Sequence, residues 1–471
     1  MTTPVSTAQS EPDAAEIIAG HLARATYDDL PANVVAHTKI CILDTLGCIY
    51  AGTGTDEVRA ITDLVLEQGG RETSTLIGNG SRKVPAASAT FVNAAAVHQY
   101  DFDDTHDKAV CHPTSTSLAP ALAIAEQRGK VSGRELITAI ALGNDITSRV
   151  AMAIGGRLDD YPWFRAPVVG LFGAAATSAK MSGCTAEQHR HALGLALPMN
   201  GGTLASLHQG GSSVRSIRDG LSYRNGVLAA ELALRGVRGD AGVFDGPYGF
   251  YKVFFRGEYD RAQLVDGLGT RFETARVALK PWPAIRHLHR SLTAVLDTMA
   301  REKLVFDDIV EVAVHIGEST RKLCKTAALG DIPAKRMDLL STLGFVIGAA
   351  IRHRGVPLQL YRDTALADDV IEKAMPKVRW VLDPRLTSRA TFENAHVEIT
   401  TRDSRVHIGE CSVGLGHPDN PMSLDQRHRK FRECALAARN PPSSAQIDDI
   451  IATVDRLEQL DRIALLSRLL A

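Results

Sequence analysis

Acidic residues, imidazoles and hydroxyls are concentrated between two apolar stretches of the chain, 91–97 and 118–125. Three aspartates lie in the run Asp101-Phe102-Asp103-Asp104-Thr105-His106, which is followed by His112-Pro113-Thr114-Ser115. Such polar groups are costly to bury, so core packing alone does not explain why they occur in this segment. Carboxylates and imidazoles are groups that transfer protons in enzymes. The segment is therefore a candidate site for proton transfer next to a carboxylate substrate.

His112 is the candidate acid or base of this segment. It directly precedes Pro113, and proline is typical of the first position of a helix. The N-terminus of such a helix can hold an anion, and His112 would lie beside that anion. Asp101 could fix the tautomer of this histidine, while Thr105 and Asp104 could contact the substrate. The alternative interpretation is structural, because aspartates and threonines also suit turns and helix caps.

Two basic segments could hold the charge of a carboxylate substrate. Lys280 begins a run of prolines and basic side chains that ends at Arg290. Cations at a helix N-terminus oppose the helix dipole, so we expect some of them to serve the substrate. Arg215 follows the Gly/Ser segment 210–213 and could clamp a carboxylate with two hydrogen bonds, with Arg165 and Arg149 as further candidates. For both segments the alternative is a solvated surface.

Other chemistries are disfavoured by spacing. The glycines of 210–220 match no phosphate-binding pattern, and no strand is predicted before them. His287 and His289 are two residues apart, as are His189 and His191, so on a helix each pair would point to different faces. The aspartate segment matches no specific metal-ligand spacing, and the chain has no Gly-x-Ser-x-Gly sequence. We expect no metal in the site.

Composition indicates an ordinary globular protein. With 471 residues the chain is long for one core, which favours two domains. It is 45% hydrophobic and 23% charged, with a net charge of −1. Without a strong field or a basic stripe interleaved with aromatics, neither nucleic acid nor a membrane surface is an expected partner.

Cysteine usage and the N-terminus indicate a cytoplasmic location. The seven cysteines are dispersed, odd in number and without a Cys-x-x-Cys pair, which favours free thiols in a reducing compartment. Residues 1–12 are polar and contain no apolar signal core. No uncharged apolar stretch approaches the length of about 18 residues that a membrane span requires, so we expect none.

The hydrophobic period divides the chain into regions. Residues 12–255 read as helices with many glycines and alanines on their faces, which predicts a dense bundle. After about residue 268 the period changes. We predict strands at 310–316 and 378–382, a hairpin at 396–400 and 405–408, and helices at 291–302 and 337–352.

The chain then returns to helix, with Ser423 as a cap and a last amphipathic helix over 447–470. The predicted fold is mainly α. Residues 1–268 and 410–471 form a large all-helical domain, and residues 269–409 form a smaller α+β lid domain inserted before the C-terminal helices.

Several segments together resemble the MmgE/PrpD family. The first is His98-x-x-Asp101-Phe102-Asp103-Asp104-Thr105, followed by His112-Pro113 and an apolar helix that ends in Ala125-Glu126. The others are Gly170-x-x-Gly173-Ala174-Ala175-Ala176, Gly220 with Gly226-Val227-x-Ala229-Ala230, Lys280-Pro281-Trp282-Pro283, and Gly416-His417-Pro418-x-Asn420-Pro421-Met422-Ser423. The resemblance covers nearly the whole chain, and it is specific for the family rather than for one reaction.

Members of this family include 2-methylcitrate dehydratase, cis-aconitate decarboxylase and iminodisuccinate epimerase. The resemblance implies a helical domain built from both ends of the chain, an α+β lid, a cleft between them and a homodimer. It also implies catalysis without an organic cofactor. Asp101, Thr105, His112 and Lys280 match positions that line the decarboxylase active site.

The chain departs from the decarboxylase pattern at several positions. Arg215 stands where many members have lysine, and a guanidinium cannot donate a proton near neutral pH as an ammonium can. Residues 163–167 replace a His-Pro pair, Phe345 falls where a tyrosine is used, and Ile285 falls near a further histidine. The gap from Thr105 to His112 is also one residue longer. These departures predict a shifted substrate or reaction.

The leading hypothesis is a hydro-lyase similar to 2-methylcitrate dehydratase that acts on a small di- or tricarboxylate. Removing the weakly acidic proton next to a carboxylate requires fixed cations that stabilise the developing charge. Arg215 and Lys280 are the expected clamp, with His112 as the acid/base group. The alternatives are an epimerase or racemase of an amino- or imino-dicarboxylate, a decarboxylase of the cis-aconitate type, and a family member without catalytic activity.

Overall fold

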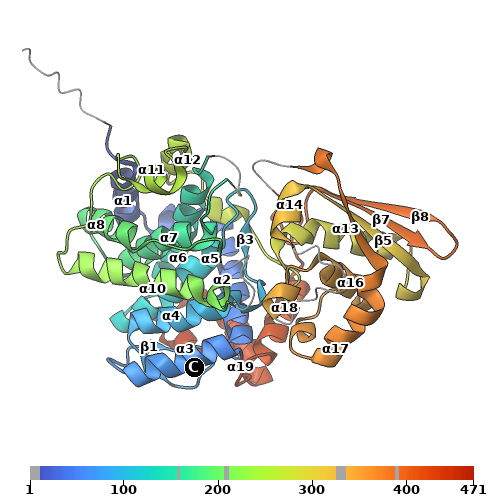
Figure 1. The fold of residues 1–471 in the computed structure, drawn as a ribbon. Helices are drawn as coiled ribbons and strands as arrows, with labels where there is room; N and C mark the ends of the chain where they lie inside the picture. Colours follow the sequence, from blue (N-terminus) through green and yellow to red (C-terminus); the bar gives the residue numbers. More distant parts are fainter. Residues whose placement is uncertain (1–10, 156–159, 206–211, 325–335, 388–391) are drawn as a thin grey trace, which may run out of the picture.

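The computed structural model describes residues 11–155, 160–205, 212–324, 336–387 and 392–471. Gly210 and Gly211 of the Gly/Ser segment lie outside these residues. Figure 1 shows a large helical part beside a smaller part in which helices pack on a sheet. The fold is mainly α, which confirms the predicted class. The boundaries at residues 269 and 409 stay a prediction.

The helical body is a dense bundle. Its central helices approach closely because they meet at glycines: a Cβ at Gly173 would lie 1.8 Å from Thr147 Oγ1, and one at Gly226 would lie 2.6 Å from Ala174 Cβ. Small residues thus permit the packing that the sequence predicted. The helices are α1 (Ala14–Arg24), α2 (Ala32–Gly52), α3 (Asp56–Gln68), α4 (Ala86–Val97), α5 (Pro113–Arg128), α6 (Gly133–Met152), α7 (Arg165–Met181), α8 (Ala186–Ala196), α10 (Val214–Leu234), α11 (Phe250–Phe255) and α12 (Arg261–Val265).

Helix α2 lies in the core of this body. By length and composition alone, its most apolar window of 18 residues could cross a membrane. In the folded chain 78% of that window is buried, and the helix packs against α4, α6 and α18. Its place in the core accounts for its apolar composition. No other helix in the described ranges passes the same test.

The smaller part, for which the predicted name lid is kept only as a label, is built on a four-stranded sheet of order β6-β5-β7-β8. Strands β5 and β6 are parallel, and the other two pairs are antiparallel. The predicted strands and the hairpin are confirmed. The lid strands are β5 (Ile309–Ile316), β6 (Val378–Leu382), β7 (Ala395–Thr401) and β8 (Val406–Cys411), and the helices are α13 (His289–Arg301), α14 (Glu318–Leu323), α15 (Arg336–Leu339), α16 (Leu343–His353) and α17 (Thr364–Asp369).

Alternation along β5 and β7 separates two faces of this sheet. Val314 and Val397 are opposite each other and fully buried on the inner face, which packs against α13. Their neighbours His315 and His396 are also opposite each other and partly exposed on the outer face. A side-chain period of two therefore gives this sheet an apolar side and a polar side.

The C-terminal helices α18 (Leu424–Leu436), α19 (Ser444–Asp455) and α20 (Ala464–Leu470) return to the body, where α18 and α19 pack against α2. Ser423 caps α18 as predicted. The ammonium of Lys430 lies 2.6 Å from Asp44 Oδ1, and both side chains are buried. This ion pair ties the last part of the chain to an early helix.

The single helix predicted over 447–470 is wrong, because the segment forms α19 and α20 with a break between them. At the break, the carbonyl of Leu460 accepts from the amide of Gly133, and the amide of Ile463 donates to the carbonyl of Val131. These tertiary hydrogen bonds use backbone groups that a continuous helix would require.

Two short ribbons complete the fold. Strands β1 (Ser74–Thr75) and β2 (Lys83–Val84) pair within the body. Strands β3 (Thr105–His106) and β4 (Val277–Ala278) join the aspartate segment to the chain that precedes the lid.

Candidate active site

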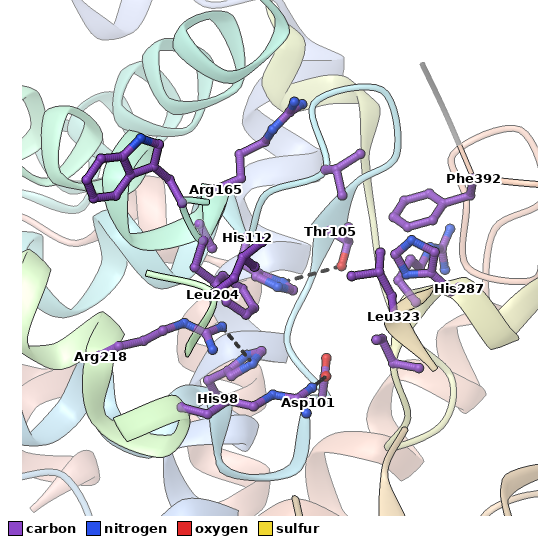
Figure 2. A pocket seen from close by; sticks show the side chains of 17 residues that line it. His98, Asp101, Thr105, His112, Arg165, Leu204, Arg218, His287, Leu323 and Phe392 are labelled. Atoms are coloured by element: carbon purple, nitrogen blue, oxygen red, sulfur yellow. Dashed lines mark hydrogen bonds and ion pairs between the residues drawn. The ribbon is translucent and has the colours of Figure 1, made fainter. Parts of the chain in front are cut away.

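A pocket of about 740 Å³, counting the space at its opening, lies where the body meets the lid. Figure 2 shows His98, His112 and Arg218 on one side of it, and His287, Leu323 and Phe392 on the opposite side. The lining residues are His98, Asp101, Thr105, Val110, His112, Trp163, Phe164, Arg165, Ala166, Leu204, Arg215, Arg218, Ile285, Arg286, His287, Leu323 and Phe392. The pocket thus brings together the aspartate segment and parts of both basic segments.

Three long helices begin at this pocket. His112 is the N-cap of α5, Arg165 is the first residue of α7, and Arg215 is the second residue of α10. The N-terminus of a helix carries a partial positive charge and unpaired amides, both of which favour an anion. The sequence predicted this arrangement for α5 alone. Convergence of three such ends makes the pocket suited to a ligand with more than one negative group.

The β3–β4 ribbon positions Lys280. Thr105 lies opposite Ala278, two residues before Lys280. Asp101 has a left-handed backbone, with φ of 47°, and its carbonyl accepts from the ammonium of Lys280 at 2.8 Å. The same ammonium also donates to the carboxylate of Asp101. Lys280 is fully buried and lies behind Asp101 rather than in the lining of the pocket.

Asp101 links the two cations predicted as the carboxylate clamp. Its Oδ1 contacts Lys280, and its Oδ2 accepts from Arg215 Nη2 at 3.0 Å. Burial would raise the pKa of Asp101, but Lys280, His98 and Arg215 together hold that pKa well below its usual range. Asp101 is therefore a fixed anion that orients Arg215 at the pocket. It is not the partner of His112 that the sequence suggested.

His112 is held by its Nδ1 atom, which donates to the carbonyl of Asp104 at 2.8 Å. The same nitrogen lies 3.3 Å from Asp103 Oδ2 and 3.4 Å from Thr105 Oγ1. With Nδ1 protonated, Nε2 carries the lone pair. Burial lowers the pKa of His112, and Lys280 lowers it further while Asp103 opposes the shift. The imidazole is therefore neutral near pH 7 and able to accept a proton.

His98 and Arg218 also line the pocket, and sequence reasoning did not assign them to the site. His98 Nδ1 donates to Asp103 Oδ1 at 3.0 Å, and His98 Nε2 accepts from Arg218 Nη2 at 3.3 Å. Both nitrogens of His98 are engaged, whereas Nε2 of His112 has no hydrogen-bond partner among the described residues. The guanidinium of Arg218 also lies 3.5 Å above the ring of Phe164. The spacing of Arg215 and Arg218, three residues apart on one helix, is the signal that could have predicted this residue.

Arg165 is a pocket cation without a carboxylate partner among the described residues. Its Nη1 donates to the carbonyl of Ala109 at 3.4 Å. Burial lowers the pKa of Arg165 to about 10, so the guanidinium stays charged at neutral pH. It can therefore receive a substrate carboxylate without first breaking an ion pair.

His287 contributes an imidazole from the lid side. Its ring packs edge-on against Phe392, with centroids 4.7 Å apart. Neither ring nitrogen has a hydrogen-bond partner within the described ranges, and burial lowers the pKa of His287 to about 4. A neutral imidazole with two open positions can hydrogen-bond a ligand. The sequence contained this residue in its basic segment but gave no reason to separate it from His289.

Two predicted substrate contacts lie outside the pocket. Arg149 Nε donates to Asp145 Oδ2 at 2.8 Å, and Arg149 also donates to the carbonyls of Asp266 and Arg271. It therefore holds the loop after α12 against α6. Asp104 Oδ1 accepts from the amide of Thr114 at 3.3 Å, so this carboxyl caps α5.

Burial, together with Asp103 and Asp44, raises the pKa of Asp104 to about 7. Replacing Asp104 with Asn should therefore stabilise the protein mainly at alkaline pH. A raised folded-state pKa means that the wild type loses stability as pH rises from about 4 to about 7, while the amide does not titrate. We expect the advantage of Asp104→Asn to grow by roughly 2 to 3 kcal/mol between pH 5 and pH 8.

Thermal and urea unfolding at the two pH values measure this difference. The Asn oxygen can still accept from Thr114, so the cap is kept. An advantage of equal size at pH 5 and pH 8 would show that Asp104 is ionised across that range.

His98, Asp103 and His112 also form a set whose ligand atoms lie within 4.8 Å of one another, so they could hold a cation. Their present contacts are those of hydrogen-bonded imidazoles, with each Nδ1 directed at an oxygen. This arrangement serves proton transfer directly, because it fixes the tautomer of His112.

Comparison with known proteins agrees with these motifs. The model of the MmgE/PrpD N-terminal domain matches residues 16–262, and that of the C-terminal domain matches residues 282–456. The cis-aconitate decarboxylase of Mus musculus is 25% identical over 466 residues, with 97% of this chain and 93% of the relative covered. The enzyme of the same name from Homo sapiens is 24% identical, with coverages of 94% and 91%. That from Aspergillus terreus is 26% identical, with coverages of 92% and 91%. The chain belongs to the MmgE/PrpD family.

Proposed function

We propose that this protein is a lyase that acts on a small di- or tricarboxylate by proton transfer next to a carboxylate, without an organic cofactor. The observation that carries the proposal is that a neutral, oriented His112 shares one pocket with three helix N-termini and with Arg165, Arg215 and Arg218. Such a site can stabilise the charge that develops on a carboxylate as the neighbouring C–H bond breaks. The names of the relatives support the lyase class.

We favour loss of water as the reaction. His112 Nε2 would take the proton next to the carboxylate, and the C–H electron pair would form the new double bond as the C–O bond of a β-hydroxyl breaks. The proton held by His112 would then pass to the departing hydroxyl, so that water leaves and the imidazole is neutral again. Arg215, Arg218 and Arg165 would hold the substrate carboxylates, and Thr105 would hydrogen-bond the substrate. Asp101 would orient Arg215, with Lys280 as its counter-ion.

Loss of carbon dioxide is the second candidate, and the decarboxylase relatives favour it. In that reaction a C–C bond breaks first, and an acid must then deliver a proton to the carbanion. The lowered pKa of His112 suits a base better than an acid, because the ring is neutral near pH 7. Arg215 cannot supply the proton either. These two features are our reason for placing water loss first.

Incubation with a panel of citrate-like and malate-like acids in deuterated water, followed by NMR and mass spectrometry, distinguishes the reactions. An alkene with loss of water supports the proposal. Loss of carbon dioxide with deuterium incorporated supports the second candidate. Deuterium exchange without a change of formula would indicate an epimerase instead. Ligand binding without any of these would indicate a family member that has lost catalysis.

We also propose that the protein is a cytoplasmic homodimer that contacts its partner through α10. Val214, Leu221 and Leu228 recur every seven residues and are 48%, 39% and 42% exposed, so they form an apolar stripe on this helix. Exposed apolar stripes of this kind favour association.

All seven cysteines are free thiols, which supports the proposed location in a reducing compartment.

Replacing both Leu221 and Leu228 with Glu is expected to convert the dimer to a monomer. Two charges per chain would have to be desolvated at the interface, which costs several kcal/mol. Light scattering during size-exclusion chromatography measures the mass. Val253→Glu, at a residue 58% exposed on α11, is the matched control and should leave the mass unchanged. A monomeric wild type, or a double variant that stays dimeric, would contradict the proposal.

A further inference from the structure

A second group of chemically capable side chains lies on the outer face of the lid sheet. It consists of His315 on β5 and of His396 and Glu398 on β7. His315 and His396 are directly opposite each other across the two strands, and Glu398 follows His396 by two residues. The period of a strand therefore places all three side chains on one face. None of the three lines the pocket described above.

The spacing of their ligand atoms is close to that of a tetrahedral metal site. Glu398 Oε1 lies 3.3 Å from His315 Nε2 and 3.6 Å from His396 Nε2, and each residue offers one ligand atom within 4.8 Å of those of the other two. Zinc bonds of about 2.0 to 2.1 Å place neighbouring tetrahedral ligands about 3.4 Å apart. The two imidazoles meet edge to face, with an interplanar angle of 90°, so they approach without stacking.

A fourth residue orients one of these ligands. Glu410 on β8 lies opposite His396, and its Oε1 is 3.3 Å from His396 Nδ1. A carboxylate at Nδ1 keeps the proton on that nitrogen and leaves the Nε2 lone pair for a metal. Carboxylate–histidine pairs of this kind are typical of zinc sites.

Hydrogen bonding alone leaves part of this cluster unsatisfied. His315 Nε2 is buried and has no hydrogen-bond partner within the described ranges, although it lies near Glu398. A buried nitrogen without a partner is costly, and a metal ion would satisfy it. The side chains of His315, His396 and Glu398 keep 15%, 26% and 35% of their surface exposed, so an ion can enter and water can complete its coordination.

We propose that His315, His396 and Glu398 bind a zinc-class divalent cation, with Glu410 as the orienting residue. Two imidazoles and one carboxylate favour zinc and its neighbours over calcium or magnesium, which prefer oxygen ligands. The ion would join β5 to β7. Strand β5 is followed by α14, whose Leu323 lines the pocket, and β7 is preceded by Phe392, which also lines it. The ion therefore braces the two lid segments that reach the substrate pocket.

Zinc itself is the probe. Tag-free, full-length protein, first stripped with a chelator, is titrated with Zn²⁺ against a chromophoric competitor, and its unfolding temperature is measured with and without the metal. The wild type is expected to bind one ion per chain at this cluster and to unfold at a higher temperature when loaded. His396→Ala and Glu398→Gln should each lower the affinity at least 100-fold. Glu410→Gln should lower it about 10-fold.

His407→Ala is the matched control. His407 lies on β8 opposite Ile399 of the inner face, where it pairs with Glu302 at 3.4 Å, and its removal should leave zinc affinity unchanged. His112→Ala tests whether zinc binds instead to the imidazoles of the candidate active site, and this variant should also leave the zinc affinity unchanged. The proposal is overturned if the wild type binds no zinc, or if His396→Ala and Glu398→Gln bind zinc as tightly as the wild type does. It is also overturned if His112→Ala is the variant that loses zinc affinity. Circular dichroism of each variant establishes that it is folded.

Discussion

Replacing His112 with alanine is expected to lower kcat by about 10³-fold, within the range of 10² to 10⁴ that a positioned acid/base group contributes. The reason is geometric. Nδ1 is fixed by the carbonyl of Asp104, and burial keeps the ring neutral, so this imidazole can accept a proton without a prior rearrangement. Both nitrogens of the neighbouring His98 are engaged, so it cannot take over the role. Steady-state kinetics on the substrate that the acid panel identifies measures the effect.

The pH profile gives a second readout for His112. The base must be neutral, so kcat/KM should fall as pH drops through its folded-state pKa. That pKa is lowered by burial, so the acid limb should lie below pH 6.5. His189→Ala is the control, because it removes a buried imidazole that lies on α8 outside the pocket and has no hydrogen-bond partner among the described residues. Near-normal turnover of His112→Ala would remove this residue from the mechanism.

Replacing Asp101 with Asn is expected to reduce both stability and activity. The amide would leave the fully buried ammonium of Lys280 with only the more distant carboxylate of Asp103, at 3.9 Å, and removal of one partner of a buried ion pair costs about 3 to 5 kcal/mol. The guanidinium of Arg215 would lose its 3.0 Å contact and its fixed orientation at the pocket. We expect a clear fall in unfolding temperature and a loss of roughly 100-fold or more in kcat/KM. Thermal unfolding and steady-state kinetics on the same preparation measure the two effects.

The variant Asp145→Asn is the control that separates the effect of Asp101→Asn on stability from its effect on kcat/KM. Asp145 and Arg149 form a comparable ion pair at 2.8 Å, with both side chains fully buried, and neither residue lines the pocket. Burial raises the pKa of Asp145 although Arg149 opposes the shift, so this variant should lose less stability than Asp101→Asn and keep the kcat/KM of its folded fraction. If Asp101→Asn unfolds at the same temperature as the wild type, the ion-pair network does not stabilise the fold. If its kcat/KM resembles that of Asp145→Asn, Asp101 has no role in orienting the site.

Much of the secondary structure was predictable because it depends on interactions between residues that are a few positions apart in the chain. Pro113 fixes the first turn of α5, so the place of His112 at a helix N-terminus followed from two adjacent residues. Ser423 caps α18 through Gln426, three residues later. The alternation at 396–400 and 405–408 was sufficient for a hairpin. The helix predicted over 447–470 failed because hydrogen bonds from a distant loop interrupt it.

The partners within the site were less predictable. The closely spaced aspartates at 101, 103 and 104 have similar propensities, so their sequence does not say which of them contacts which cation. The left-handed backbone of Asp101 and the pairing of β3 with β4 decide that Asp101 meets Lys280, while Asp103 lies between the imidazoles of His98 and His112. Arg149, which composition could not distinguish from a pocket arginine, is used instead to hold a loop.

By itself, the sequence determined the mainly helical class, the family, the acidic segment beside a helix start, and the polar groups from which an acid/base site could be built. Only the tertiary structure decided which groups meet. Lys280 reaches Asp101 across 179 positions of the chain, and Arg218 reaches His98 across 120. Caps, turns and strand alternation depend on neighbours a few residues apart. Contacts over such separations depend instead on how α5, α7, α10 and the lid pack, which no short stretch of sequence contains.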